Sequence, residues 1–431
     1  MTTDPGAALQ QPRGSHADAS TSRRLTAWRA VVGLGVVSLA ADMVYEGARS
    51  VTGPLLEQLG ASALLAGIVT GAGEAAALVL RLVFGRAADR ASRYWPMTIA
   101  GYAMTAISVP LLALTPFVGA AGLALACTLI LVERTGKAVR SPAKSTLLAF
   151  VASGVGLGRA FGVHKALDQT GAFAGPLLVA AIVAATGVIW PSMAILLLPG
   201  IAALLLLAWL RPRIGEPAEQ QTTTSPASSV PTTALDGAPA PRARLPRTFW
   251  LFAASSAAAT AGLAPFGVIS YHFSREHVIG LAHIPVVYAA GMAIAAVAAL
   301  GSGVGYDRIR GKVLYVLPPL AAVVPWLTFT DHAGLALIGV LIWGAASGIQ
   351  DSTVKALVAD LVPAGRRATA YGVYAAVQGA GAMLGGVLAG GIYPHSIALL
   401  GITIAAIEAA ALILFAVTMR ASRGRPLPAA G

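Results

Sequence analysis

The sequence predicts an all-α membrane protein, with twelve transmembrane helices arranged as two pseudo-symmetric six-helix bundles around a central cavity. Of its 431 residues, 56% are hydrophobic and only 11% are charged, whereas a soluble protein of this length has about a quarter of its residues charged. Apolar runs of about 20 residues, the length that crosses a bilayer, recur almost to the end of the chain. The two halves of the chain also repeat the same motifs. Together these observations indicate an integral membrane protein with an internal repeat.

The positions of the apolar runs predict where the twelve helices lie. In the first half, helices are expected at residues 27–48, 60–84, 96–115, 119–139, 160–186 and 190–210. In the second half, they are expected at residues 248–271, 284–304, 313–330, 333–354, 368–391 and 396–418. The segment between the sixth and seventh runs is rich in Pro, Thr, Ser and Ala and has no apolar periodicity. Since it cannot bury a core, we predict a linker there.

The same pattern divides the chain into five regions. We expect a disordered cytoplasmic tail (1–22), an N-terminal six-helix bundle (23–212), a cytoplasmic linker (213–246), a C-terminal six-helix bundle (247–419) and a cytoplasmic tail (420–431). No small-residue cleavage site follows the first apolar run at the distance typical of a signal peptide, so we expect this run to be retained as a span.

The basic residues predict the orientation of the chain. The net charge of +12 is distributed in short clusters between apolar runs, without a basic domain, so we expect no nucleic-acid partner. One such cluster, Arg140 and Lys144, follows the fourth predicted span. By the positive-inside rule, the alternation of these clusters places both termini in the cytoplasm, which requires an even number of spans. The composition is that of a bacterial chain, so we expect a multi-pass protein of the inner membrane.

A first repeated motif closes the second and the eighth predicted spans. Both copies have the pattern G-x-x-x-D-R, and their residues are Gly85, Asp89 and Arg90 in the first copy and Gly303, Asp307 and Arg308 in the second. A second repeat opens the fifth and eleventh spans with identically spaced glycines, which are Gly162, Gly171 and Gly175 in one and Gly372, Gly381 and Gly385 in the other. Six helices repeated in the same topology indicate two bundles that face each other across a midplane cavity.

On these residues the chain resembles the major facilitator superfamily, and the resemblance covers essentially the whole folded chain. In that family the loop after span two acts as a cytoplasmic latch, which implies a gating role for the two G-x-x-x-D-R copies. An Asp near a helix N-terminus gains only about 0.3–1 kcal/mol, so motion can break such a contact. The resemblance implies secondary transport by alternating access, without a cofactor.

The fifth predicted span is similar to the antiporter signature of bacterial drug/proton exporters in that superfamily. The matching residues are Gly162, Gly171, Gly175 and Pro176, although Val179 and Ala180 occupy the positions of a usual glycine pair. The alternative is that these small residues only let membrane helices approach closely, whatever is transported. The resemblance also relates Arg134 to the arginine of the exporter signature on span four, where Lys137-Ala138 replaces the usual Gln-Gly.

Three ionisable residues lie within the first predicted span. Asp42, Glu46 and Arg49 are spaced by four and three residues, so they share one face of a helix. A charged side chain at the bilayer centre costs about 2.5–3.5 kcal/mol, and these residues are therefore expected to face the bundle interior or water. Two alternatives remain open: a Glu46–Arg49 pair that only locks neighbouring helices, or an Arg49 at the outer interface.

Other predicted spans also carry charges, namely Glu74, Glu133, Arg134, Lys137 and Asp168. In the family these spans line or flank the transport path, which implies a hydrated cavity. Desolvation raises the pKa of a carboxylate, so an acid that alternates between water and burial can load a proton on one side and release it on the other. We expect Asp42 and Glu46 to be the leading proton-coupling acids, with the other three acids in reserve.

The remaining basic residues of this set, Arg49, Arg134 and Lys137, are expected to line the cavity and to neutralise the acids. Glu408 stands alone among apolar residues in the last predicted span. That span is peripheral in the family, so we expect Glu408 to be paired or to lie at the lipid edge.

Other motifs exclude some function classes. The segment GLAPFG (262–267) interrupts the seventh span, and Pro265 is interpreted as a gating kink or a purely structural one. His272, His277 and His283 share one predicted loop, but their spacing matches no compact metal motif, so no metal is expected. No Gly-rich lysine loop for ATP and no nucleophile-and-base constellation is evident, so we do not expect an enzyme.

The sequence therefore predicts a monomeric, proton-coupled exporter of small molecules, either drug-like or metabolites, in a lipid bilayer. The first alternative is a proton symporter or facilitator that imports a small metabolite. The second is a membrane sensor or scaffold that transports nothing.

Overall fold

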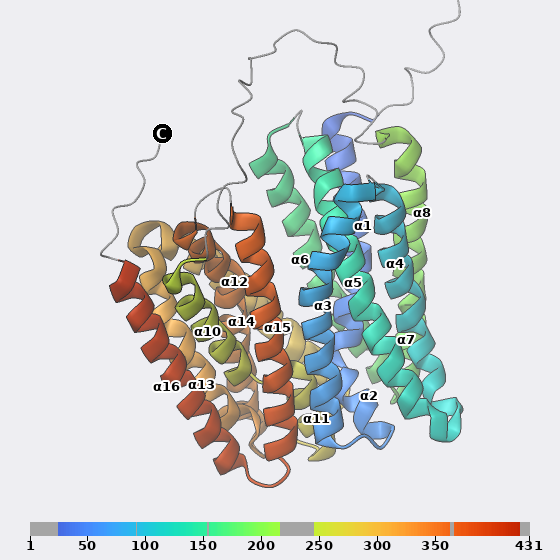
Figure 1. The fold of residues 1–431 in the computed structure, drawn as a ribbon. Coiled ribbons are helices and arrows are strands. Elements are labelled where there is room, and N and C mark those ends of the chain that lie inside the picture. Colours follow the sequence, from blue (N-terminus) through green and yellow to red (C-terminus); the bar gives the residue numbers. More distant parts are fainter. Residues whose placement is uncertain (1–24, 92, 153–154, 216–244, 363–365, 423–431) are drawn as a thin grey trace, which may run out of the picture.

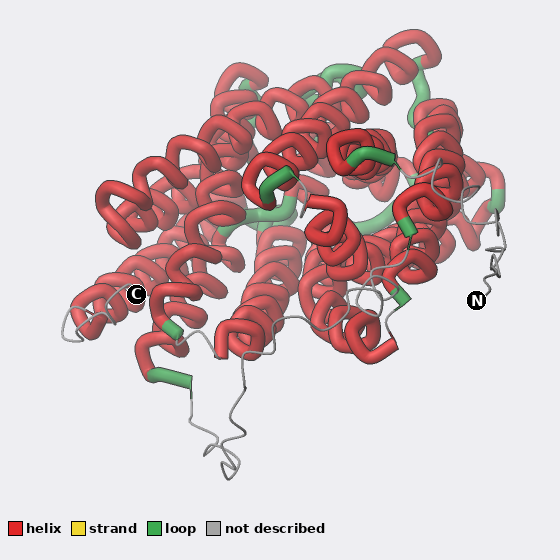
Figure 2. Tube along the Cα trace, turned by 90° about the horizontal axis from the view of Figure 1, so that it is seen from above, coloured by secondary structure: helices red, strands yellow, loops and turns green. Residues whose placement is uncertain are grey.

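The computed structural model describes residues 25–91, 93–152, 155–215, 245–362 and 366–422. Within these ranges every regular element is a helix (Figures 1 and 2). The predicted N-terminal tail, most of the predicted linker and residues 423–431 of the predicted C-terminal tail lie outside the described residues.

The first half of the chain contains ten helical elements. They are α1 (Ala27–Ser50), α2 (Thr52–Gln58), α3 (Ala63–Ala91), α4 (Tyr94–Leu111), η2 (Leu112–Phe117), η3 (Gly119–Ala121), α5 (Gly122–Ala152), α6 (Leu157–Thr186), α7 (Trp190–Ile195) and α8 (Leu197–Ile214). The second half contains α10 (Arg247–Gly262), α11 (Phe266–Arg275), α12 (Ile284–Ile309), η4 (Arg310–Val316), α13 (Leu317–Thr328), α14 (Ala333–Leu361), α15 (Arg367–Ile392) and α16 (Ile397–Ser422).

Eleven helical runs of the described residues are long and apolar enough to cross a membrane, whereas twelve spans are predicted. Ten of the runs each overlap one predicted span. The eleventh, Ile284–Thr328, has 45 residues and contains two predicted spans. A single crossing needs about 20 residues, so this run is long enough for two.

Local sequence explains where several helices begin and end. The hydroxyl of Thr26 accepts a hydrogen bond from the Arg29 backbone N–H at 3.4 Å and caps the start of α1. Gly187 ends α6 with a φ of +75°, a left-handed conformation that glycine adopts without strain. Between α10 and α11, Leu263 is extended and Pro265 has no N–H to donate. The predicted interruption of this span is therefore confirmed.

The two halves of the chain pack against each other through α3 with α15, α6 with α12, and α2 with α11. At the α3–α15 contact, a Cβ on Gly67 would collide with the backbone oxygen of Gly386, and one on Gly386 would collide with that of Gly67. Only glycine permits so close an approach of two backbones, as is common between membrane helices.

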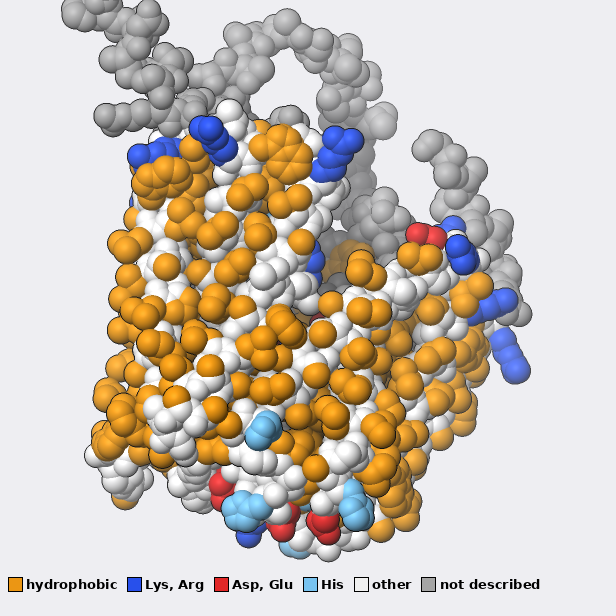
Figure 3. Space-filling view, turned by 180° about the vertical axis from the view of Figure 1, so that it is seen from behind, with side chains coloured by type: hydrophobic (Ala, Val, Ile, Leu, Met, Phe, Trp, Pro, Cys, Tyr) orange, Lys and Arg blue, Asp and Glu red, His pale blue; other side chains and the backbone are white. Residues whose placement is uncertain are grey.

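The apolar core shows that the two halves join at one end of the molecule. We call the end that carries Ile214, Arg247 and Arg420 the linker end, and the opposite end, which carries Glu57 and Glu276, the far end. The largest buried cluster takes residues from both halves, including α2 and α11 at the far end. Two further clusters take residues from one half each, the first half in one and the second half in the other. The halves diverge toward the linker end (Figure 1), where the molecular surface is hollowed between them (Figure 3).

Candidate functional site

Three helices of the first half bring six charged residues together between the two halves. Glu46 and Arg49 come from α1, Glu74 from α3, and Glu133, Arg134 and Lys137 from α5. We call these six residues the central cluster. It holds three acids and three bases, so its formal charges cancel. Glu46, Glu133 and Arg134 are each less than a tenth exposed, which agrees with the prediction that these side chains face inward.

Ion pairs connect most of the central cluster. Glu74 Oε1 lies 2.8 Å from Arg49 Nη2 and 3.6 Å from Arg134 Nη1, so one carboxylate bridges two guanidinium groups. Arg134 Nε also lies 3.5 Å from Glu133 Oε2. The alternative Glu46–Arg49 pair within α1 is present at 3.8 Å. Arg49 is nevertheless closer to Glu74, which belongs to another helix, and it points into the bundle rather than to an outer interface.

Tyr45 organises the basic members of the central cluster. Its phenol oxygen accepts hydrogen bonds from Arg134 Nη1 and, at 3.4 Å, from Arg49 Nη1. Lys137 Nζ lies 3.7 Å from the centre of the Tyr45 ring, a cation–π geometry. Tyr45 was not among the predicted site residues, although it directly precedes Glu46 in the chain.

Tyr288 of α12 connects the central cluster to the second half. Its buried hydroxyl donates a hydrogen bond to Glu46 Oε2. The ring is held by aromatic contacts, with centroids 4.5 Å from Phe266 and 6.1 Å from Trp343. Glu46 therefore contacts a basic residue of one half and a phenol of the other. Nothing in the sequence marked Tyr288, which lies in an apolar run.

A small cavity adjoins these ion pairs at the boundary of the two halves. Arg49, Glu74 and Arg134 line it from the first half together with Thr52 and Thr70, and Pro265, Phe266 and Gly267 line it from the second. Its volume is about 10 Å³, roughly the space of one water-sized sphere. The central cluster is thus packed between the halves rather than widely open.

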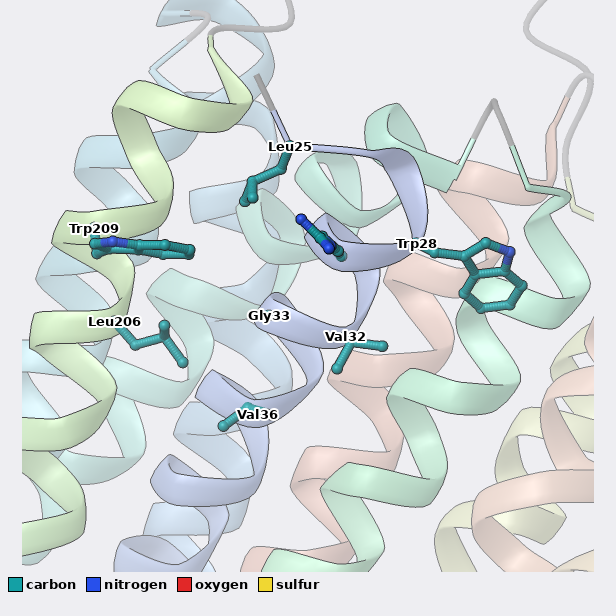
Figure 4. Close-up of a pocket in the computed structure, with 8 residues that line it drawn as sticks. Leu25, Trp28, Val32, Gly33, Val36, Leu206 and Trp209 are labelled. Atoms are coloured by element: carbon teal, nitrogen blue, oxygen red, sulfur yellow. The ribbon is translucent and has the colours of Figure 1, made fainter. Parts of the chain in front are cut away.

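A larger hollow of about 590 Å³ lies on the outside of the first half, between α1 and α8 (Figure 4). Its lining residues are Leu25, Trp28, Arg29, Val32, Gly33, Val36, Leu206 and Trp209. No acid lines it, and it shares no residue with the central cluster. We therefore place the candidate site at the central cluster.

A second cluster lies nearer the linker end, one turn of α1 away from Glu46. Its acids are Asp42 of α1 and Asp168 of α6, whose carboxyl groups lie close enough to influence each other. Ser38 donates to Asp168 Oδ1 at 2.8 Å. Because two carboxylates this close repel each other, this acid pair is suited to hold one proton.

Basic residues surround the acid pair. Arg140 Nη2 lies 3.9 Å from Asp42 Oδ1, and Lys144 Nζ lies 3.8 Å from Asp168 Oδ1. Lys165, on the same helix as Asp168, is 2.7 Å from Asp168 Oδ2. Each acid of the pair is therefore held beside at least one cation, which offsets the cost of burying it.

The prediction that Arg140 and Lys144 follow the fourth span is wrong. Helix α5 continues to Ala152, and Arg140 is only 3% exposed and donates to Thr105 Oγ1 at 2.6 Å. A hydropathy pattern predicts that a span ends where charged residues begin. Here Arg140 and Lys144 pair with acids of other helices and lie inside the bundle. Both residues are thus part of the site.

Two glycines of the antiporter-like motif bring α6 against α1. A Cβ on Gly171 would collide with the backbone oxygen of Leu39, and one on Gly175 with that of Met43. Pro176 follows, buried inside α6. Gly162 of the same motif has no neighbour within 4 Å of an added Cβ. Gly171 and Gly175 therefore have a direct packing role, which brings Asp168 close to Asp42.

The two G-x-x-x-D-R copies end α3 and α12 at the linker end. Gly85 and Gly303 are half-buried, and Arg90, Asp307 and Arg308 are exposed. The side chain of Asp89 lies outside the described residues. Their gating role remains a prediction.

The three histidines near the far end are not arranged as a metal site. His272 is buried on α11, with its ring 5.3 Å from those of Phe329 and Tyr393. Within the described part of the chain, no group of three His, Cys, Asp or Glu residues is placed to hold a metal ion.

A multi-pass helical membrane protein with ion pairs buried between two packed halves has the architecture of a transporter. The family model of the Major Facilitator Superfamily matches residues 34–385 and again residues 307–431. The chain belongs to this superfamily of membrane transporters, and the predicted family is confirmed.

Relatives and solved structures agree with this assignment. The chain is 48% identical over 409 residues to the uncharacterized proteins Rv2265 of Mycobacterium tuberculosis and Mb2288 of Mycobacterium bovis, over 93% of this chain and 97% of each relative. A variant of the nucleoside transporter NupG has a similar structure, with a TM-score of 0.72 at 14% identity over 90% of this chain and 99% of that chain. A POT family transporter in complex with 5-aminolevulinic acid gives 0.67 at 14% identity, over 92% of this chain and 96% of that chain. At such identities these structures show the fold alone.

Proposed function

We propose that this transporter couples the movement of protons to the export of a small molecule by alternating access. The observation that carries the proposal is the closeness of the Asp42 and Asp168 carboxyl groups, which favours one shared proton because two ionised groups would repel each other. Loss of that proton leaves two like charges in contact, which favours separation of α1 from α6. Protonation of the pair is thus linked to the packing of two helices beside the central cluster.

The architecture that this mechanism needs is two six-helix bundles that rock against each other. We infer that the run Ile284–Thr328 crosses the membrane twice, which gives twelve spans. The bundles are then residues 23–212 and 247–419, joined by the linker. The shared core at the far end and the hollow at the linker end correspond to a state that is closed at the far end.

The charge distribution supports an orientation. Most Lys and Arg side chains on the face shown in Figure 3 lie at the linker end, whereas Asp, Glu and His gather at the far end. By the positive-inside rule we place the linker end, and with it both termini, in the cytoplasm of a bacterial cell. The state with a closed far end then faces inward.

The central cluster favours a polar substrate with an anionic group. Glu74 is bound by Arg49 and Arg134, and a carboxylate or phosphate of the substrate would compete with Glu74 for the same two guanidinium groups. An apolar molecule would instead leave these ion pairs in place and gain little from them. We therefore favour a polar metabolite over an apolar drug.

Transport in everted vesicles tests the coupling. Compounds that raise the melting temperature of the purified protein are added to vesicles with an acidified lumen, and a pH-sensitive dye follows the lumen. We expect these compounds to alkalinise the lumen with wild type, but not with Asp42→Asn or Asp168→Asn. Asp331→Asn, which alters an exposed acid of the far end, serves as the control and should behave as wild type. Uptake of the compound without proton movement in wild type would refute the proposal.

A proton symporter that imports a metabolite is the second candidate. The observation that favours it is the packing role of Gly171 and Gly175, which accounts for the motif without antiport. In vesicles with a neutral lumen that contains the compound, a symporter carries compound and protons out together. An exporter of the antiport type exchanges them in opposite directions.

A further inference from the structure

Glu408 of α16 is a buried acid that the mechanism above does not use. It is 1% exposed, and neither of its carboxyl oxygens has a hydrogen-bond partner among the described residues. The expectation that it is paired or lies at the lipid edge is therefore wrong. By contrast, every acid of the two clusters in the first half has a basic group within 4 Å.

No charged group among the described side chains pairs with Glu408. Helix α16 packs mainly on α10 and α13, with smaller contacts to α15 and η4. The described ionisable side chains of these elements and of α16 itself are Arg247, Arg310, Lys312, Tyr315, Tyr371, Tyr374 and Arg420. None of them forms a hydrogen bond with Glu408. Since an unpaired carboxylate in an apolar interior is far too costly to maintain, Glu408 is a neutral, protonated acid in this state.

The carboxyl group lies directly against the break between α10 and α11. A Cβ on Gly262, the last residue of α10, would collide with Glu408 Oε1. The next residues, Leu263 to Pro265, are not helical. Glu408 therefore contacts the point at which this span can bend.

Helix α11, beyond that break, closes the far end. Tyr271 donates from its hydroxyl to the backbone oxygen of Ala61 at 2.8 Å, and Ser274 donates to Glu57 Oε2 at 3.1 Å. A Cβ on Gly267 of α11 would collide with the side chain of Thr70 of α3, so the two helices approach closely there. Opening of the far end requires α11 to leave α2 and α3, and the non-helical residues beside Glu408 are where it can pivot.

We propose that Glu408 is a proton-binding site of the far-end gate. It holds a proton while α11 closes the far end, and it loses this proton when α11 moves and water reaches the break. The inference rests on the proposed alternating access, but it does not depend on Asp42 or Asp168. Because the closed state binds the proton more tightly, a rise in pH favours the open far end, by up to about tenfold in the open-to-closed ratio per pH unit.

Spin labels across the far end test the linkage. Labels are placed at the exposed Gln58 of α2 and Glu276, which follows α11, through Gln58→Cys and Glu276→Cys in a Cys127→Ser background. Distances are measured by electron paramagnetic resonance on the full-length protein between pH 5 and 9. We expect the long-distance population to grow with pH in this background and to stay low at every pH when Glu408→Gln is added. An unchanged pH dependence in the Glu408→Gln protein would overturn the proposal.

Two further measurements separate this proposal from the coupling mechanism. Asp42→Asn should abolish proton-coupled transport and keep the pH-dependent distance, so each proposal fails on its own readout. Infrared spectroscopy of the wild-type protein covers the case in which Glu408→Gln does not fold. The C=O band of a carboxylic acid without a hydrogen bond should persist at a pH where exposed carboxyl groups are ionised, and absence of this band would also overturn the proposal.

Discussion

The two halves of the molecule bury their acids in different ways. In the first half, all five acids of the two clusters have a basic group within 4 Å. In the second half, Glu408 is buried with no basic partner among the described residues, and the face toward the central cluster is aromatic, with Tyr288 and Phe266. In the proposed mechanism, the charges of the first half exchange partners, whereas the second half supplies an aromatic packing surface and the far-end gate. The following changes test this division.

Loss of a central guanidinium should have the largest effect. Arg134→Ala leaves Glu133 buried without its ion-pair partner and removes one of the two partners of Glu74. Breaking a buried pair typically destabilises a protein by about 3–5 kcal/mol. We expect a clear drop in melting temperature and no transport. Arg420→Ala, which removes an exposed arginine at the end of α16, should change stability by about 0.5 kcal/mol or less. Equal melting temperatures for the two variants would mean that the ion pairs are not needed.

Two glycines of one motif should respond in opposite directions. Gly171→Ala places a methyl group against the backbone of α1, and such overpacking costs about 1–3 kcal/mol. Gly162→Ala adds a methyl group where no atom lies within 4 Å, and alanine favours a helix over glycine by up to about 1 kcal/mol. Thermal denaturation in detergent should therefore rank Gly162→Ala at or above wild type and Gly171→Ala below it. The reverse order would contradict the close contact of α6 with α1.

Removal of the phenol that joins the two halves should shift their equilibrium. Tyr288→Phe deletes the hydrogen bond to Glu46, and a hydrogen bond to a charged group contributes about 1.5–3 kcal/mol. We expect the open-far-end population to rise about tenfold or more in spin-label distances. Tyr374→Phe removes a hydrogen bond to Ser256 within the second half and should leave this population unchanged. A shift of similar size in both variants would argue against a specific role for the Tyr288 contact.

The smallest effect is expected at the exposed rim of the second cluster. The Lys165 side chain is 65% exposed although its ammonium group is 2.7 Å from Asp168. An exposed ion pair contributes about 0–1 kcal/mol and is screened by salt. Lys165→Ala should therefore shift the melting temperature slightly at low salt and not at high salt. A large loss that persists in high salt would show that Lys165 is part of the buried network.

The fold was predictable because the lipid environment restricts the chain to apolar helices. The eight charged residues proposed for the cavity all lie on α1, α3, α5 or α6. The segment 305–312 differs from the prediction. The sequence predicts a break between two spans there, whereas the structure has one continuous helical run that passes through η4. The charged residues of this segment predict a loop, but the structure has the short 3₁₀ helix η4 instead.

Other parts of the site depend on contacts between helices that are distant in sequence. Tyr288 becomes a site residue only because α12 packs beside α1. In the sequence, Arg140 resembles a basic residue that marks the cytoplasmic end of a span. In the structure it lies inside the bundle, where it pairs with Asp42 of α1. Glu408 was expected to be paired or at the lipid edge because the last span is peripheral in the family, whereas the structure buries it against Gly262 of α10. Local pattern identifies the ionisable groups, but not the partners that give them a role.

The meeting of Gly67 with Gly386 has a mechanical consequence. At this contact two backbones touch without interlocked side chains. One helix can therefore tilt or slide along the other with few rotamer changes. In the proposed alternating-access mechanism, a single methyl group at that contact should restrict the movement of one half against the other. Turnover would then slow although the ion pairs of the central cluster are unchanged.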